Sequence, residues 1–352
     1  MINKAINIPA LLKIGNGKLF KIGKYLFDRK FMKVALFFSE GIEPVVAGQL
    51  YAGFKEFGIE IVHKDDISDI NIENVVHTAF KIPSETNVLL GIGGGKALDY
   101  SKYCAHVLKL PFISVPTSVS NDGFCSPNTS LLVSGKRKSV KSTIPYGVVA
   151  DLDVISNAPE VSLYSGIGDT ISKVTSLWDW KQAFLKKNES HSDFAALISH
   201  NSLEILYCNS SREDVKTYDF QFKMVNSLIL SGIAMEIAGS SRPASGSEHL
   251  ISHALDDISA KPHMHGLQVG TATYFCSLLQ DNKPDFVRDF LTNIGFIDLV
   301  SKNPINKKEF AEALKLAPEI KSNYYTVLSE KDSLQRGLKL LDSDKTLNMI
   351  IR

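Results

Sequence analysis

The sequence has few of the features that mark disulfide-rich or membrane proteins. Only four of its 352 residues are cysteine, and Cys104, Cys125, Cys208 and Cys276 lie far apart without forming a Cys-x-x-Cys pair. This spacing argues against a disulfide framework or zinc knuckle and favours a reduced, cytoplasmic compartment. No apolar run reaches the roughly 20 residues that span a bilayer. The N-terminal residues lack the apolar core and cleavage site of a signal peptide, so neither secretion nor membrane insertion is expected.

An excess of charge of one sign is also missing. The chain has 39 basic and 38 acidic residues, a net charge of +1, which argues against nucleic acid or a membrane surface as the main partner. Only "GKRKSVK" at 135–141 is locally basic, and we expect it to form a solvated hairpin tip. The 44% apolar and 22% charged content is that of an ordinary globular protein. A chain of this length predicts about two domains.

The pattern of hydrophobic residues changes near residues 155–160. Before that point, short β-branched or aromatic runs at 33–38, 59–63, 87–92 and 111–116 alternate with segments of helical periodicity. This alternation predicts an α/β domain over 1–157 with a Rossmann-like parallel sheet. After "SNAPE" the periodicities are long and helical, which predicts an all-α domain over 158–352.

A glycine-rich turn follows the predicted strand at 87–92. In "NVLLGIGGGKALD", glycines at 91 and 93–95 precede a helical segment. Glycines there let the backbone approach an anion, and the free N–H groups of a helix start point at it, which suits a dinucleotide pyrophosphate. The spacing differs from both the GxGxxG and the P-loop patterns, which disfavours a nucleotide triphosphatase. The alternative is a turn needed only for packing the helix on the sheet.

A polar loop follows the next predicted strand. In "SVPTSVSNDGFCSP", Thr117, Ser118 and Ser120 supply short hydroxyls at the carboxyl end of a strand, where open α/β sheets bind ligands. Asp122 with Gly123 is equally consistent with an ordinary turn. Beside the glycine-rich turn, we expect this loop to face a cofactor.

One aspartate and a group of histidines could bind a metal. Asp169 is expected at a helix start, where an N-cap is the alternative role. Two histidines, His249 and His253, are four residues apart and share one helix face. A third, His265, follows a loop. Carboxylate and imidazole ligands suit a divalent first-row metal, and three ligands with an open position describe a catalytic site, although each histidine alone could be structural.

Four motifs together carry a resemblance to a known superfamily. "GIGGGKALD", "PTSVSNDGFCSP", "GIGDTISK" and "EHLISHAL…HMHG" occur in an order and separation similar to those of the dehydroquinate synthase-like, iron-containing alcohol dehydrogenase and glycerol dehydrogenase superfamily. The motifs cover roughly residues 85–275. Within the superfamily, "PTSVSNDGFCSP", "GDTISKVTSLWDWKQA" and "SSRPASGSEHLISHALD" most resemble sn-glycerol-1-phosphate dehydrogenases.

The resemblance implies an active site in a cleft between the two domains. There Asp169, His249 and His265 would bind the metal, and His253 would face substrate and nicotinamide. A further carboxylate, Asp122, would bind the polyol end of the substrate. Cofactor contacts are implied for Gly93, Gly94, Gly95, Lys96, Thr117, Ser118 and Ser126. Glu40 falls where the family places an acid on the adenosine ribose, which favours NAD over NADP.

The implied activity is a reversible, metal-dependent hydride transfer between NAD(P) and sn-glycerol 1-phosphate or dihydroxyacetone phosphate. Glycerol dehydrogenase, acting on a free polyol, is the nearest alternative, and a dehydroquinate synthase-like lyase or a non-catalytic nucleotide-binding protein are further ones. Zinc is the favoured metal, although the ligand types also accept iron or nickel. We expect a homo-oligomer.

Three residues bear on the substrate. The planar fork of Arg242 in "SSRPASG" could grip a substrate phosphate, with a surface or helix-terminus arginine as the alternative. Asn121 stands before Asp122 where phosphate-using relatives commonly have histidine. The role of Lys173 is not assigned by the resemblance.

Overall fold

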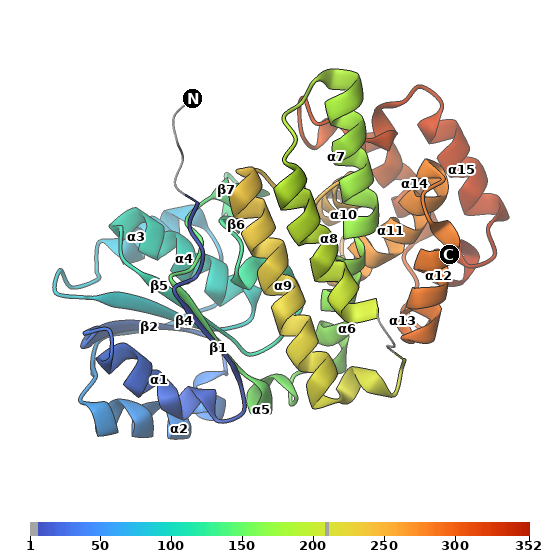
Figure 1. Cartoon of the computed structure of the whole chain (residues 1–352). Coiled ribbons are helices and arrows are strands. Elements are labelled where there is room, and N and C mark those ends of the chain that lie inside the picture. The colour runs from blue at the N-terminus through green and yellow to red at the C-terminus, as the bar shows by residue number, and fades with distance from the viewer. Residues whose placement is uncertain (1–5, 208–210) are drawn as a thin grey trace. The chain divides into compact units, whose positions relative to one another are not determined.

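The computed structural model describes residues 6–207 and 211–352 (Figure 1). The chain divides into two compact units, Met1–Pro159 and Glu160–Arg352. Each unit is described on its own below. Cys208 lies outside the described residues, and Cys104, Cys125 and Cys276 are buried free thiols. Among the described residues, no helix has both the length and the apolar character needed to cross a membrane.

The first unit is built on a six-stranded parallel sheet. All four strands expected from the sequence are present, and two more, β1 and β8, extend one edge. The order across the sheet is β1-β8-β5-β4-β2-β3, with every pairing parallel. The central strands are buried along their length, which is why they read as continuous apolar runs. The strands are β1 (Leu11–Gly15), β2 (Lys33–Ser39), β3 (Glu60–Ile67), β4 (Val88–Gly93), β5 (Phe112–Pro116) and β8 (Gly147–Asp151).

Helices cover both faces of this sheet. In Figure 1, α1 and α2 lie on one face, and α3 and α4 lie on the other. Leu36, Leu90 and Val149 of the strands belong to one buried apolar cluster with Leu26 and Leu50 of the helices. The helices are α1 (Lys18–Phe27), α2 (Glu43–Phe57), α3 (Ile72–Ala79), α4 (Gly95–Leu108) and the short α5 (Leu152–Ile155).

The connections of the sheet reverse direction between β2 and β4. The chain runs from β2 outward to β3, then returns to place β4 on the other side of β2. Such a switch point opens a crevice at the carboxyl ends of the two strands, where open α/β sheets bind their ligands. The glycine-rich turn follows β4 at this point.

A separate two-stranded sheet carries the basic segment. β6 (Asn128–Val133) and β7 (Lys136–Lys141) form an antiparallel hairpin with Ser134 and Gly135 in its turn. β7 is exposed along nearly its whole length. The prediction of a solvated hairpin is therefore confirmed.

The described residues of the second unit form helices, short 3-10 turns and one isolated β-bridge between Ile305 and Ile351. The predicted fold class, a parallel α/β sheet followed by an all-helical region, is confirmed. The helices are α6 (Glu160–Ile171), α7 (Lys173–Lys187), α8 (Asp193–Tyr207), α9 (Tyr218–Ala238), α10 (Ser247–Ile258), α11 (His265–Gln280), α12 (Pro284–Asn293), α13 (Phe296–Ser301), α14 (Lys307–Leu316), α15 (Ser333–Ser343) and α16 (Leu347–Ile350).

Candidate cofactor and metal sites

The glycine-rich turn lies at the switch point of the sheet. Gly93 has a φ of 144°, and a Cβ there would lie 2.1 Å from the Oγ of Ser39 at the end of β2. The Gly94 N–H donates to the same Oγ at 3.0 Å. Only glycine fits where the ends of β2 and β4 approach so closely. The turn thus depends on Ser39, a residue that the sequence did not single out.

The same turn leaves room for an anion at the start of α4. A Cβ on Gly94 would meet nothing within 4 Å, and one on Gly95 only Asn121 Nδ2 at 3.9 Å. No side chain of the described residues caps this 14-residue helix. Free N–H groups at an uncapped helix start, reached over glycine, fit a pyrophosphate. Lys96 is exposed beside them, and Glu40 is exposed immediately after β2.

The polar loop after β5 is tied to this turn. The Thr117 N–H donates to the Gly93 carbonyl at 3.0 Å, which brings Thr117 and Ser118 to the glycines. Asp122 begins a short 3-10 turn in which Asn121 Oδ1 accepts from the Gly123 N–H at 2.8 Å. Ser126 is buried farther along, and its Oγ donates to the Asn128 carbonyl at 2.9 Å. The loop's own hydrogen bonds therefore engage Ser126.

A buried lysine supports the Asp122 loop from beneath. Lys102 Nζ in α4 donates to the carbonyls of Gly123 (2.6 Å) and Ser126 (3.1 Å) and lies 3.4 Å from Asp99 Oδ1. Burial lowers the Lys102 pKa and raises that of Asp99, while their mutual attraction opposes both shifts. The signal for this pair was present as Asp and Lys three residues apart on the helix after the glycines, but it was overlooked.

Three side chains of the second unit converge as a candidate metal site. Asp169, His249 and His265 offer ligand atoms that all lie within 4.8 Å of one another. Asp169 Oδ1 is 3.4 Å from His249 Nε2 and 3.9 Å from His265 Nε2. Asp169 and His249 are buried, and His265 is partly exposed. A carboxylate and two imidazoles held at this separation, with one side accessible, suit a divalent first-row metal.

The expectation that Asp169 begins a helix is wrong. It lies near the end of α6, whose twelve residues include Gly166 and Gly168. A Cβ on Gly168 would lie 1.9 Å from the Gly266 carbonyl oxygen, and one on Gly266 would lie 1.8 Å from that of Ser165. These glycines serve helix packing and do not interrupt α6. Because Gly168 precedes Asp169 and Gly266 follows His265, the same backbone contact between α6 and α11 brings the two ligands together.

Hydrogen bonds at Nδ1 orient both imidazoles so that Nε2 of each ring is turned toward Asp169. His249 Nδ1 is 2.9 Å from Glu248 Oε1. His265 Nδ1 is 3.1 Å from Ser252 Oγ, whose own proton goes to Gln268 Oε1 at 2.7 Å. Both rings are therefore placed to donate from Nδ1, and Nε2 is the nitrogen of each ring that is turned toward Asp169. Second partners of this kind are usual for metal-binding histidines.

The electrostatics of the site also fit a cation. Asp169, Asp179 and Glu248 are all buried, and the buried ammonium of Lys173 lies 3.9 Å from Asp169 Oδ2. Burial alone would raise the pKa of Asp169, but Lys173 and His249 hold it well below its usual range. Burial lowers the pKa of His249, and its bonds to Asp169 and Glu248 outweigh that effect and raise it. The residues present thus favour positive charge between the imidazoles.

The other two histidines of the group lie apart from the ligand set. The ring of His253 stacks on His265 with centroids 5.7 Å apart, and its centroid is 6.4 Å from that of His249. His263 is half-buried, with Nε2 2.9 Å from the Asn303 carbonyl. His253 therefore borders the site, whereas His263 belongs to the surface.

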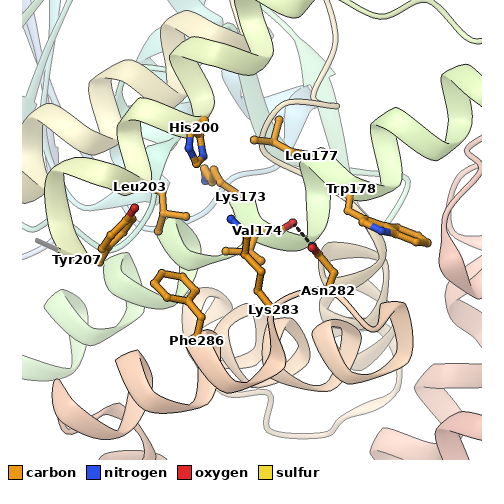
Figure 2. A pocket seen from close by; sticks show the side chains of 10 residues that line it. All are labelled: Lys173, Val174, Leu177, Trp178, His200, Leu203, Tyr207, Asn282, Lys283 and Phe286. Atoms are coloured by element: carbon orange, nitrogen blue, oxygen red, sulfur yellow. Dashed lines mark hydrogen bonds between the residues drawn. The ribbon is translucent and has the colours of Figure 1, made fainter.

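Lys173 connects the site to a neighbouring cavity. Its Nζ donates to the Asp169 carbonyl at 2.7 Å and lies 3.9 Å from Asp169 Oδ2. Figure 2 shows the cavity of about 520 Å³ that Lys173 lines, between α7, α8 and the start of α12. Leu203, Phe286 and other apolar side chains dominate its walls. We assign Lys173 to the support of the Asp169 carboxylate.

Arg242 occupies neither of its expected positions. The side chain is 1% exposed, its Nε and Nη2 donate to the Glu189 carboxylate, and its Nη1 donates to the Tyr325 carbonyl at 2.8 Å. The Tyr324 ring centroid lies 3.4 Å from its Cζ. Arg242 is therefore a buried anchor for the segment that precedes α10, and its expected grip on a substrate phosphate is wrong.

Curated relatives match three quarters or more of the chain. The glycerol-1-phosphate dehydrogenase (NAD(P)+) of Methanosarcina barkeri is 34% identical over 98% of this chain and 97% of its own length. The enzyme of the same name from Thermococcus kodakarensis is 39% identical over 75% of this chain and 76% of its own length. These similarities extend across both units.

Solved structures and a family model give the same picture. Glycerol dehydrogenase from Schizosaccharomyces pombe aligns with 99% of this chain and 92% of its own, with a TM-score of 0.79 at 20% sequence identity, which shows the shared fold. The family model for iron-containing alcohol dehydrogenase matches residues 13–159. The resemblance seen in the four sequence motifs is confirmed: the chain belongs to the iron-containing alcohol dehydrogenase family.

Proposed function

We propose that this protein is an NAD(P)-dependent, metal-dependent glycerol-1-phosphate dehydrogenase that interconverts sn-glycerol 1-phosphate and dihydroxyacetone phosphate. The observation that carries the proposal is the sequence identity of 34–36% to enzymes of that name, over 92–98% of this chain. The cluster of Asp169, His249 and His265 supports it, because a divalent metal held there would act as a Lewis acid on the reacting oxygen.

The metal would be held by the carboxylate of Asp169 and the Nε2 atoms of His249 and His265. When bound, it polarises the ketone or lowers the pKa of the alcohol. His253 stacks on His265 and borders the open side of the cluster, and we assign it the transfer of the alcohol proton. Asp122 would accept hydrogen bonds from the substrate's hydroxyl groups. Zinc suits this ligand set.

The cofactor would lie at the switch point of the first unit. Gly93, Gly94, Gly95 and Lys96 would contact the pyrophosphate, and Thr117 and Ser118 approach the same turn. The nicotinamide, when bound, carries the hydride. Glu40, exposed after β2, would repel a 2′-phosphate, so we propose that NAD is preferred over NADP.

A substrate panel tests the proposal directly. The purified protein is assayed with NADH or NADPH and with dihydroxyacetone phosphate, free dihydroxyacetone or a simple aldehyde, before and after chelation. We expect oxidation of NADH with dihydroxyacetone phosphate, at least about tenfold loss on chelation, and recovery with zinc. A preference for free dihydroxyacetone would instead identify a polyol dehydrogenase, and no reduction of any carbonyl would reject the dehydrogenase assignment.

Metal analysis of two histidine variants tests the ligand set. Loss of an imidazole ligand in His249→Ala should remove bound metal and activity together. His263→Ala is the matched control, because His263 belongs to the same segment but is bonded to the Asn303 carbonyl and lies outside the ligand set. Stoichiometric zinc retained by His249→Ala would reject the ligand assignment.

A further inference from the structure

A buried glutamate stands directly behind one of the proposed metal ligands. Glu248 is 0% exposed, and its Oε1 lies 2.9 Å from His249 Nδ1. The Gly246 N–H donates to the same oxygen at 2.6 Å, and Thr175 Oγ1 donates to Oε2 at 2.7 Å. A buried carboxylate is costly unless several donors satisfy it, and here three do. These three donors hold the Glu248 carboxylate in one position behind His249.

The two proposed histidine ligands differ in the group that accepts the hydrogen bond from Nδ1. His249 donates to the Glu248 carboxylate, whereas His265 donates to the neutral hydroxyl of Ser252. A carboxylate acceptor makes the imidazole a stronger electron donor than a hydroxyl does, and it fixes the ring more firmly. The metal would therefore be bound by two imidazoles that differ in how strongly they donate electrons to it.

We propose that Glu248 is a positioning residue that fixes His249 as the Nδ1–H tautomer and makes it the stronger of the two imidazole ligands. This inference rests on the proposed metal site. Glu248 does not touch substrate or metal and acts only through His249. Its effect should therefore be seen first in metal affinity and in the ring's tautomer.

The surrounding backbone gives Glu248 a second means of fixing the ligand. Glu248 Oε1 accepts from the Gly246 N–H, and Asp179 Oδ2 accepts from the Ser247 N–H at 2.7 Å. Two carboxylates thus hold the first N–H groups at the start of α10, where negative charge is favourable. Because His249 lies in the first turn of α10, these bonds also set the direction of its side chain.

The variant Glu248→Gln tests the effect of the negative charge of this side chain, because glutamine has nearly the same shape as glutamate. Glutamine keeps an oxygen for His249 Nδ1 and Gly246, and its amide can donate to Thr175 Oγ1, so the fold is expected to persist. Zinc affinity is measured by competition with a chromophoric chelator. Loss of the carboxylate should weaken zinc binding by about 10- to 100-fold. Ser252→Ala, the matched control behind His265, should weaken it less than Glu248→Gln does.

Two further measurements keep the test decisive. Long-range ¹⁵N NMR of the metal-bound wild-type protein should show His249 protonated at Nδ1, whatever the variants do. Thermal unfolding of the chelated proteins should give similar midpoints for wild type and Glu248→Gln, which excludes a merely structural effect.

The outcomes separate this inference from the proposed function. If wild type binds no zinc at these ligands, the proposed function fails. If wild type binds zinc, the inference is overturned by Glu248→Gln affinity within twofold of wild type, by a Ser252→Ala loss as large as that of Glu248→Gln, or by an Nδ1-bound metal.

Discussion

Two lysines are buried and a third, Lys321, is half-buried, and each meets a different partner. Lys102 holds carbonyls of the Asp122 loop, and Lys173 holds the Asp169 carboxylate. Lys321 donates to Ser241 Oγ at 3.2 Å, and its ammonium lies 4.6 Å from the Tyr324 ring centroid. Among the described residues, no carboxylate comes within ion-pair distance of Lys321. Burial, with the neighbouring positive charge of Arg242, lowers its pKa to about 8.

The depressed pKa of Lys321 predicts a pH dependence of stability. The ordinary lysine pKa of 10.5 applies to the unfolded chain, so between about pH 8 and 10.5 the unfolded state binds the proton that the folded state has lost. Stability from this group therefore rises with pH across that window. We expect Lys321→Met to remove the rise, as measured by urea midpoints at pH 7.5 and 9.5.

Lys315→Met serves as the control for that experiment. Lys315 is exposed on α14 and pairs with Glu312 at 2.9 Å. Its replacement should leave the pH dependence as in wild type. An unchanged pH profile in Lys321→Met would contradict the assignment.

At the scale of the elements, the contact between α6 and α11 positions two of the three candidate metal ligands, Asp169 and His265. Gly168 and Gly266 let the two backbones touch, and Gly270 continues the contact one turn later, where a Cβ would lie 2.8 Å from the Cα of Gly168. Side chains at these positions would force the helices apart. Asp169 and His265, one residue from the touching glycines, would separate with them.

Gly266→Ala should therefore damage stability and metal binding together. Its Cβ would collide with a backbone oxygen that cannot rotate away, and we expect a loss of about 3 kcal/mol in the free energy of unfolding. Zinc affinity should fall as well. Urea denaturation and chelator competition measure the two effects.

Gly48→Ala is the opposite case. Gly48 lies in α2, and a Cβ there meets nothing within 4 Å, so alanine should stabilise the protein by about 0.5–1 kcal/mol. If Gly266→Ala behaved like Gly48→Ala, the close helix contact would not exist in solution.

The sequence predicted the buried elements better than the exposed or glycine-containing ones. Strands at 33–38, 87–92 and 111–116 agree closely with β2, β4 and β5, because full burial leaves a continuous apolar run. β3 extends beyond its predicted end through Lys64 and Asp66, which an edge strand tolerates. The end of α6 was misread because glycine normally disfavours helix, and the contact that selects it comes from a segment about a hundred residues away.

At the scale of the whole molecule, each candidate site belongs to one unit. The glycine-rich turn and the Asp122 loop lie in Met1–Pro159, and the three candidate metal ligands lie in Glu160–Arg352. Each ligand should therefore protect its own region from hydrogen exchange. Chelation should speed exchange in α6, α10 and the start of α11, and NADH should slow it at residues 93–97 and 117–126.

Hydrogen-exchange mass spectrometry on wild type, chelated protein and protein with NADH checks this prediction. Helix α1, which packs on α2, β1 and β8 and carries no candidate site residue, serves as the internal control. Protection by NADH confined to the second unit would place the cofactor elsewhere.

Candidate site residues could be predicted from the sequence where residue type and spacing together indicate a chemical role. Asp169, His249 and His265 were singled out by residue type and motif, and the fold brings their ligand atoms together. Glu248 and Lys102 were missed as supporting residues because part of their support, from Thr175 and to Gly123, comes from residues distant in sequence, although Glu248 also has local partners. Arg242 shows the reverse error, since nothing local predicts its burial against Glu189 and Tyr324.

The arrangement of the metal ligands also bears on biosynthesis. Asp169 leaves the ribosome long before His265, and at about 5–20 residues per second the delay is on the order of ten seconds. Until α11 docks against α6 through their glycines, the nascent chain offers the metal one carboxylate and, late on, one imidazole. The complete ligand set therefore cannot hold a metal before translation has passed the start of α11, and we expect metal loading to be post-translational for most of this unit.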